Sequence, residues 1–106
     1  RSIGTLTSDR STASSYAAPI SNVFTGLGQI STDTNAVRIN GAEVANIATD
    51  QGTGNMGNYP LYIGRRGGTT FPFNGRIYQL VVRNALATGG DLTNLEAFVN
   101  GKTGAY

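Results

Sequence analysis

Apolar and polar residues alternate in short runs over the first half of the chain, which predicts strands rather than helices. Residues 22–30, NVFTGLGQI, carry apolar side chains on both faces of an extended chain. Residues 36–48, AVRINGAEVANIA, hold the dipeptide Asn40-Gly41 between two further runs. Both residues tolerate the positive φ that a two-residue type I′ turn requires, so this segment is predicted to be a β-hairpin.

The second half of the chain contains a long loop and two further extended segments. Residues 50–59, DQGTGNMGNY, have no periodicity and are predicted to be a loop. Residues 61–64 are predicted to be extended, and residues 76–83, RIYQLVVR, to be a strand. The apolar spacing slips within 76–83, so we expect a β-bulge near Tyr78-Gln79. Between the first strand and the hairpin, STDTN at 31–35 is predicted to be a turn.

Residues 88–100 have the only clear helical periodicity. Their apolar stripe is expected to dock on a sheet, because so short a helix is marginal in water; it consists of Leu92, Leu95, Phe98 and Val99. Thr88 and Asp91 resemble a capping box, and Gly101 is expected to end the helix. The alternative is that Asp91 itself is the N-cap.

These elements predict one domain over residues 1–106 that is all-β, with antiparallel strands and one C-terminal helix. Gly, Ser, Thr and Asn make up 45 of the 106 residues, which favours short strands joined by tight turns. Residues 1–18 are poor in large apolar groups and are expected to be loosely held. The chain begins with Arg1 rather than Met, which suggests a processed piece or a fragment.

The charge and the missing residue types narrow the function. The net charge is only +2, too little for a dedicated nucleic-acid binder. A surface rich in Ser, Thr and Asn but poor in charge is typical of an extracellular or virion protein. There is no Cys, so stability must come from packing, sheet pairing or assembly. There is no His, which excludes the nucleophilic triads that use it and the His-containing zinc and haem sites.

Without His and Cys, the remaining catalytic arrangement to consider is a pair of carboxylates, as in glycosidases. No two acids alternate on one predicted strand, and those of the helix are explained by capping and solvation. We therefore expect the protein not to be an enzyme. The acids are Asp9, Asp33, Glu43, Asp50, Asp91 and Glu96.

The loop and the residues after it hold the candidate ligand-binding side chains. Gln51, Asn55 and Asn58 offer paired donors and acceptors for sugar hydroxyls. Tyr59 or Tyr62 could stack on a pyranose face. The alternative is that Asn and Gly are present for the turns and that Tyr62 is present for packing.

Two arginines and two possible calcium ligands complete the candidates. Arg65 and Arg66 precede two glycines and could contact an anionic glycan or a nucleic acid, but a structural ion pair or carbonyl cap explains them more simply. Asp33 and Asn35 could ligate calcium, but Asx-turn hydrogen bonding explains this pair as well. We therefore expect no cofactor, with calcium as the alternative.

Several pieces in order give the chain a family resemblance. AVRINGAEVA, PLYIGR and FPFNGRIYQLVVRNAL resemble the C-terminal half of concanavalin A-like, laminin G-like jelly-roll domains, and the tail ending KTGAY resembles a variant in bacteriophage and prophage proteins. The resemblance implies an antiparallel β-sandwich. The family's N-terminal half is missing, however, so open edges and an apolar face would have to be covered. We expect a homo-oligomer, or a remnant of a longer chain.

The resemblance and the loop together predict a function. The leading hypothesis is a non-catalytic, lectin-like module for carbohydrate recognition or adhesion, in a phage tail or related surface protein. It would bind a glycan or host-surface polysaccharide, without nucleic acid and without membrane insertion. The alternative is a structural β-sandwich, a tip or spacer that drives oligomer assembly and binds no ligand. Phe71 and Phe73, two apart, are expected to pack in a core or an interface.

Overall fold

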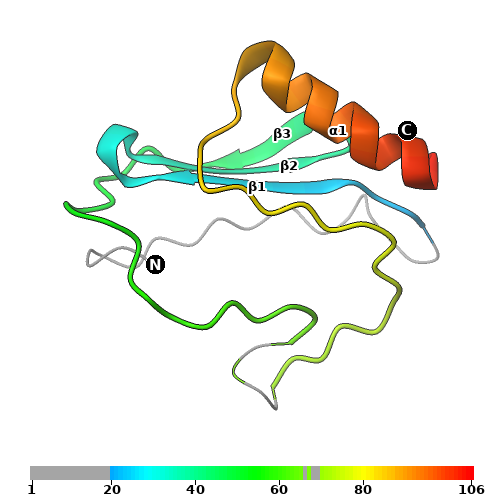
Figure 1. The fold of residues 1–106 in the computed structure, drawn as a ribbon, viewed down its shortest axis with the longest axis horizontal. Helices are drawn as coiled ribbons and strands as arrows, with labels where there is room; N and C mark the ends of the chain where they lie inside the picture. The colour runs from blue at the N-terminus through cyan, green and yellow to red at the C-terminus, as the bar shows by residue number, and fades with distance from the viewer. Residues whose placement is uncertain (1–19, 66, 68–69) are drawn as a thin grey trace.

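The computed structural model describes residues 20–65, 67 and 70–106, which form a small antiparallel sheet followed by one helix. The strand order is β1-β2-β3, and helix α1 (Gly89–Thr103) lies across one face of the sheet (Figure 1). The strands are β1 (Phe24–Gln29), β2 (Thr34–Ile39) and β3 (Ala42–Asn46). The predicted C-terminal helix and the first three predicted antiparallel strands are thereby confirmed. The prediction for residues 1–18 lies outside the described residues.

The hairpin of β2 and β3 turns at Asn40-Gly41, as predicted. Ile39 pairs with Ala42 across the turn, and both turn residues have positive φ, 52° at Asn40 and 77° at Gly41. The Asn40 side chain fixes the turn to the start of the sheet, because its Oδ1 accepts the Val23 N–H at 2.9 Å. The left-handed backbone that this turn demands is therefore supported by a specific hydrogen bond.

The register of the hairpin slips by one residue beyond the turn. Val37 pairs with Ala45 while Arg38 pairs with Glu43, so Val44 has no partner on β2. A bulge of this kind increases the local twist of the strands. The bulge predicted near residues 78–79 is wrong, since that segment forms no strand here.

A single turn of 3-10 helix, η2 (Ile30–Thr32), joins β1 to β2. Asp33 closes it with a left-handed φ of 50° and donates its N–H to the Ile30 carbonyl at 3.1 Å. The turn predicted for residues 31–35 is confirmed, but extended chain resumes already at Thr34.

Helix α1 starts where the sequence predicts, but without the expected cap. Thr88 is the N-cap residue, yet its side chain makes no capping hydrogen bond. Asp91 lies in the first helical turn, so the alternative of Asp91 as the N-cap is wrong. Its carboxylate contacts Arg83 at 2.6 Å instead of turning back on the helix. The first turn also contains a hydrogen bond from the Thr93 hydroxyl to the Gly89 carbonyl, at 3.2 Å.

The helix ends one turn later than expected, so the stop predicted at Gly101 is wrong. Gly104 is the residue with left-handed backbone, φ 57°, and its N–H reaches the Asn100 carbonyl at 2.7 Å. The Asn100 Oδ1 accepts the N–H groups of Ala105 and Tyr106 at 2.7 and 3.1 Å. These bonds satisfy the chain just past the helix, which makes the later glycine the favoured stop.

The connection from β3 to α1 does not contain the strand predicted for 76–83, and the segment 61–64, predicted to be extended, forms no strand. Among its described residues only Thr70 forms a bridge, and one backbone hydrogen bond between its two arms runs from the Phe73 N–H to the Gly64 carbonyl, at 2.7 Å. Alternating side chains favour an extended chain, but a strand also needs a neighbouring backbone to bond with. Among the described residues, segment 61–64 has only the one bond at Gly64, and segment 76–83 has no such bond to a neighbouring backbone.

The buried apolar core is small and lies in the sheet and just before the helix. It consists of Val23, Ile30, Ala36, Ile39 and Ala87. Large apolar side chains of the β3–α1 connection are exposed instead, and Phe71 and Phe73 are 76% and 58% exposed. The expected packing of these two rings is therefore not found within the described chain. In the part of the chain that the structure describes, no helix is long and apolar enough to cross a membrane.

The hairpin turn gives a stability test with a matched control. Gly41→Ala forces a Cβ into a left-handed position, where it would also lie 3.3 Å from the Tyr106 ring. We expect a loss of about 1–2 kcal/mol in the free energy of unfolding, measured by urea denaturation. Gly26→Ala meets no atom within 4 Å and should change it by less than about 0.5 kcal/mol. Equal effects of the two variants would contradict the role of Gly41.

Candidate functional site

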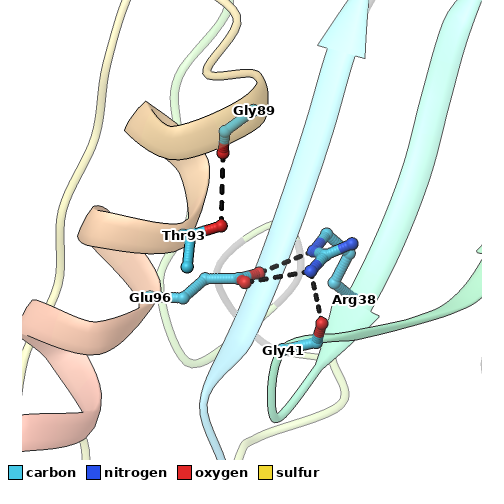
Figure 2. A network of polar contacts seen from close by, with 5 residues as sticks. All are labelled: Arg38, Gly41, Gly89, Thr93 and Glu96. Carbon is cyan, nitrogen blue, oxygen red and sulfur yellow. Dashed lines mark hydrogen bonds and ion pairs between the residues drawn. The ribbon is translucent and has the colours of Figure 1, made fainter.

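An ion pair between the sheet and the helix supports the region that could bind a ligand. Arg38 of β2 donates its Nε–H to Glu96 Oε1 at 2.7 Å and its Nη2–H to Oε2 at 3.1 Å (Figure 2). The same guanidinium also donates to the Gly41 carbonyl. Glu96 is only 4% exposed, and Arg38 is 19% exposed. One side chain thus joins the helix, the central strand and the hairpin turn.

The ion pair shifts the titration of both partners. The hydrogen bond from Arg38 holds the pKa of the Glu96 carboxyl below its ordinary value, helped by a hydrogen bond with Thr25 and opposed by burial. The hydrogen bond to Glu96 in turn raises the pKa of Arg38. Both side chains therefore stay charged at neutral pH.

An open groove of about 930 Å³ lies between the edge of β1, the helix and the chain that leads into the helix. Its apolar lining includes Leu27, Leu80, Leu95 and Val99, and its polar lining includes Gln79, Arg83, Asn84 and Glu96. Gly54, Asn55 and Met56 of the predicted binding loop form part of its wall. The edge of β1 along this groove carries no further strand among the described residues.

Two aspartates hold the base of the predicted binding loop. Asp33 Oδ1 accepts the Gln51 N–H at 2.9 Å, and Asp50 Oδ1 accepts the Gly52 N–H at 2.7 Å. The Gln51 side chain is half-buried and donates to the Thr49 carbonyl at 2.7 Å. Gln51 is thereby a structural member of the loop base, and its amide is already engaged.

The other loop candidates present their side chains to solvent. Asn55 and Asn58 are exposed, and their amides make no hydrogen bond to any residue that the structure describes. Tyr59 is 75% exposed and Tyr62 is 52% exposed. The Tyr59 ring lies against Gly57, where a Cβ would be 2.3 Å from the ring Cε2. A free amide on either side of Gly57 thus accompanies an exposed aromatic ring.

The structure separates the candidates into two groups. Asn55 lies on the wall of the groove, whereas Asn58, Tyr59 and Tyr62 do not line it. Arg65 is exposed, and Arg66 lies outside the described residues. The structure therefore has two distinct surfaces, the exposed residues 55–62 and the groove. They overlap only at Asn55 and Met56.

The weak calcium candidates have other roles. Asp33 caps the Gln51 backbone, and Asn35 belongs to β2, where it pairs with Gly28 and accepts the Ile47 N–H at 2.9 Å through its carbonyl. Within the described ranges no three metal-ligating side chains come together. The Asp33 side chain bonds to a residue 18 positions away and Asn35 bonds through its backbone, so the expected Asx-turn hydrogen bond is not found among the described residues.

Each carboxylate that the structure describes has a polar partner. Glu43 accepts from Asn46 at 3.1 Å, and the other acids bind the backbone or an arginine. Asp9 lies outside the described residues. The expectation that the protein is not an enzyme therefore stays a prediction.

The sequence pattern missed the importance of Arg38 and Glu96 and misplaced Phe98. Leu92, Leu95 and Val99 do line the groove. Phe98 is instead 53% exposed, and the Lys102 ammonium lies over its ring, 5.4 Å from the centroid of the Phe98 ring. The buried residue of the helix is Glu96. Its position four residues after Leu92 and three before Val99 places it on the apolar stripe, which was a signal that it needed a cation.

No family model matches this chain, and neither a curated protein nor a solved structure matches it. The resemblance of its motifs to jelly-roll domains therefore rests on the motifs alone.

The ion pair can be tested against an exposed pair in the same molecule. Glu96→Gln leaves Arg38 without its counter-charge and should lower the free energy of unfolding by about 2–3 kcal/mol, since the pair is largely buried. Asp91→Asn breaks the Arg83 pair, whose side chains are 39% and 56% exposed, and should cost at most about 1 kcal/mol. Urea denaturation at neutral pH measures both. Equal losses would contradict a special role for Glu96.

The same pair predicts a pH dependence. Because the folded pKa of Glu96 lies below its ordinary value of 4.5, its contribution is complete above that pH and disappears as the pH falls through the folded pKa. The stability difference between the wild-type chain and Glu96→Gln should therefore shrink on acidification. A difference that stays constant from neutral to strongly acidic pH would contradict this assignment.

Proposed function

We propose that this protein is a non-catalytic module for carbohydrate recognition or adhesion and that residues 55–62 are its binding surface. The observation that carries the proposal is the exposed ring of Tyr59 beside the amides of Asn55 and Asn58, which bond to no residue that the structure describes. The wider setting that we propose is a phage tail or related surface protein, outside the cell, on the strength of the sequence motifs. The ligand is a glycan or a host-surface polysaccharide.

The chemistry of the loop fits a sugar better than a charged ligand. A primary amide donates two hydrogen bonds and accepts two, so one amide can match two neighbouring hydroxyl groups. An aromatic ring offers an apolar face with a polar rim, which suits the C–H face of a pyranose. Residues 55–62 contain no charged side chain. A neutral polysaccharide is therefore the substrate class that this surface favours, with Arg65 close by in sequence for an anionic substituent.

Gly57 makes the position of the ring specific. A Cβ at this position would overlap the Tyr59 ring, and the Tyr59 N–H bonds to the Gly57 carbonyl at 3.0 Å. The tight turn keeps the ring against the backbone, so less conformational entropy is lost when a ligand stacks on it. A preorganised ring is what a weak, repeated carbohydrate contact needs.

At the level of the fold we propose a β-sandwich of the jelly-roll kind. The β1-β2-β3 meander with its central Asn-Gly hairpin would supply part of one sheet, and the helix covers one face of it. The open edge of β1 and the thin core support this proposal, because both would be completed by further strands.

A glycan array with matched variants tests the binding surface. Tyr59→Ala should weaken binding of any captured glycan by about tenfold or more, equivalent to about 1.4 kcal/mol. Asn58→Ala should weaken it as well, because it removes the amide next to the ring. Gly57→Ala should act in the same direction without removing any group that touches the sugar. Calorimetry with the best glycan gives the affinities.

Tyr78→Ala is the control, since Tyr78 is also exposed, at 61%, but lies outside the loop. It should leave glycan binding unchanged. Failure of the chain to bind any host polysaccharide, or equal losses for Tyr78→Ala and Tyr59→Ala, would refute the binding surface.

A second candidate function is structural assembly without a ligand. The observation that favours it is the number of large apolar side chains left exposed in the β3–α1 connection, which in monomers mark interaction surfaces; they include Leu61, Ile63, Phe71, Phe73, Ile77, Leu80 and Val82. A second copy of the chain would be the partner. In that case the exposed apolar surface, rather than the loop, would carry the function.

Sedimentation velocity separates this candidate from a monomeric binding module. If assembly is the function, the chain should sediment as an oligomer, and Phe71→Ser with Phe73→Ser should shift it toward the 11.1 kDa monomer. Tyr59→Ser, the control, should leave the oligomer intact. A wild-type chain that sediments as a stable monomer at all concentrations would rule out assembly through this surface.

A further inference from the structure

Three Asn-Gly dipeptides occur in the chain, and the structure places them in very different surroundings. They are Asn40-Gly41, Asn74-Gly75 and Asn100-Gly101. We propose that Asn74 is a site of spontaneous deamidation and that the fold protects the other two. This inference is independent of the proposed function.

The chemistry needs a flexible backbone and a free side chain. The backbone nitrogen of the glycine, after losing its proton, attacks the asparagine Cγ; the new N–Cγ bond forms, the Cγ–Nδ2 bond breaks and ammonia leaves. Water then opens the five-membered succinimide at either carbonyl and yields aspartate or isoaspartate. Glycine favours the reaction because it has no side chain to hinder the attack and few backbone restrictions.

Asn40 is held in place at the hairpin turn. Its Oδ1 accepts the Val23 N–H at 2.9 Å and its Nδ2 donates to Asn22 Oδ1 at 2.8 Å. Gly41 is bound through its carbonyl by Arg38. The side chain cannot rotate toward the next nitrogen unless these bonds open, so the hairpin suppresses the reaction.

Asn100 is held in place at the end of the helix. Its Oδ1 accepts two backbone N–H groups, from Ala105 and Tyr106, and its Nδ2 donates to the Tyr106 carbonyl. Gly101 lies inside α1, where its N–H is committed to the helical hydrogen bonds. Attack would require the last turns of the helix to unfold first.

Asn74 has none of this protection. Asn74 and Gly75 are exposed and lie outside any helix or strand. In the described part of the chain, neither the Asn74 side chain nor the Gly75 N–H has a hydrogen-bonding partner. The Phe73 ring lies close to Gly75, where an added Cβ would be 2.6 Å from the ring Cζ. The reacting groups are therefore adjacent and exposed to solvent, and no hydrogen bond to a described residue restrains them.

The modification would change a surface that the fold exposes. It replaces a neutral amide by a carboxylate between Phe73 and Arg76 and lowers the net charge from its present value of +2 by about one. The isoaspartate product also lengthens the backbone by one methylene. Both changes fall within the exposed apolar stretch of the β3–α1 connection.

Peptide mapping by mass spectrometry tests the proposal on the intact chain. After incubation at mildly alkaline pH, Asn74 should convert first, and Asn40 and Asn100 should convert at least about tenfold more slowly because local opening must precede attack. Asn58, which is exposed but followed by the bulky Tyr59, should stay intact and serves as the internal control. In denaturing urea the three Asn-Gly sites should convert at similar rates.

Isoelectric focusing gives a second readout. The aged wild-type chain should acquire a more acidic band that comigrates with Asn74→Asp, and Asn74→Gln should not form it at a comparable rate. Conversion of Asn40 or Asn100 in the native chain as fast as Asn74 would overturn the proposal. So would a native Asn74 that persists while the same residue converts in urea.

Discussion

The contact between Arg38 and Glu96 is the interaction on which the rest of this structure depends. A helix as short as α1 is marginal in water, and its most buried residue is this carboxylate rather than an apolar side chain. The Arg38 guanidinium donates to Glu96 through Nε and Nη2, and Nη2 also donates to the Gly41 carbonyl in the hairpin turn. Burying two charges is costly, so the pair adds little net free energy but fixes one position of the helix on the sheet.

Because the core is small, most of the large apolar side chains and polar groups of the β3–α1 connection lie on the surface. The buried apolar residues lie at the two ends of β1, within β2 and just before the helix, while most large apolar groups of the β3–α1 connection face solvent. A connection with few backbone hydrogen bonds leaves its amides and rings available to a ligand, to a second copy of the chain or to chemical modification. The binding loop, the exposed phenylalanines and Asn74 all follow from that one property.

Local chemistry could be predicted, but long-range pairing could not. The Asn40-Gly41 turn was predicted because the requirement for positive φ belongs to two adjacent residues. The segments 61–64 and 76–83 look extended by the same rules, yet a strand exists only where a neighbouring backbone bonds along it. Among the described residues 61–64 makes one such bond, at Gly64, and 76–83 makes none. In the loop, Tyr59 and Asn58 are exposed, as a binding role requires, whereas Gln51 proved to be part of the loop base.

The sequence alone determined the β1–β2–β3 hairpins and the presence and start of the helix, because turn residues and periodicity act over a few neighbouring positions. The tertiary structure decided that Glu96 meets Arg38, that the helix continues through Gly101 to Gly104, and that three identical dipeptides have three different environments. Those outcomes depend on groups up to 58 residues apart in the chain, and no local pattern encodes which of them will meet.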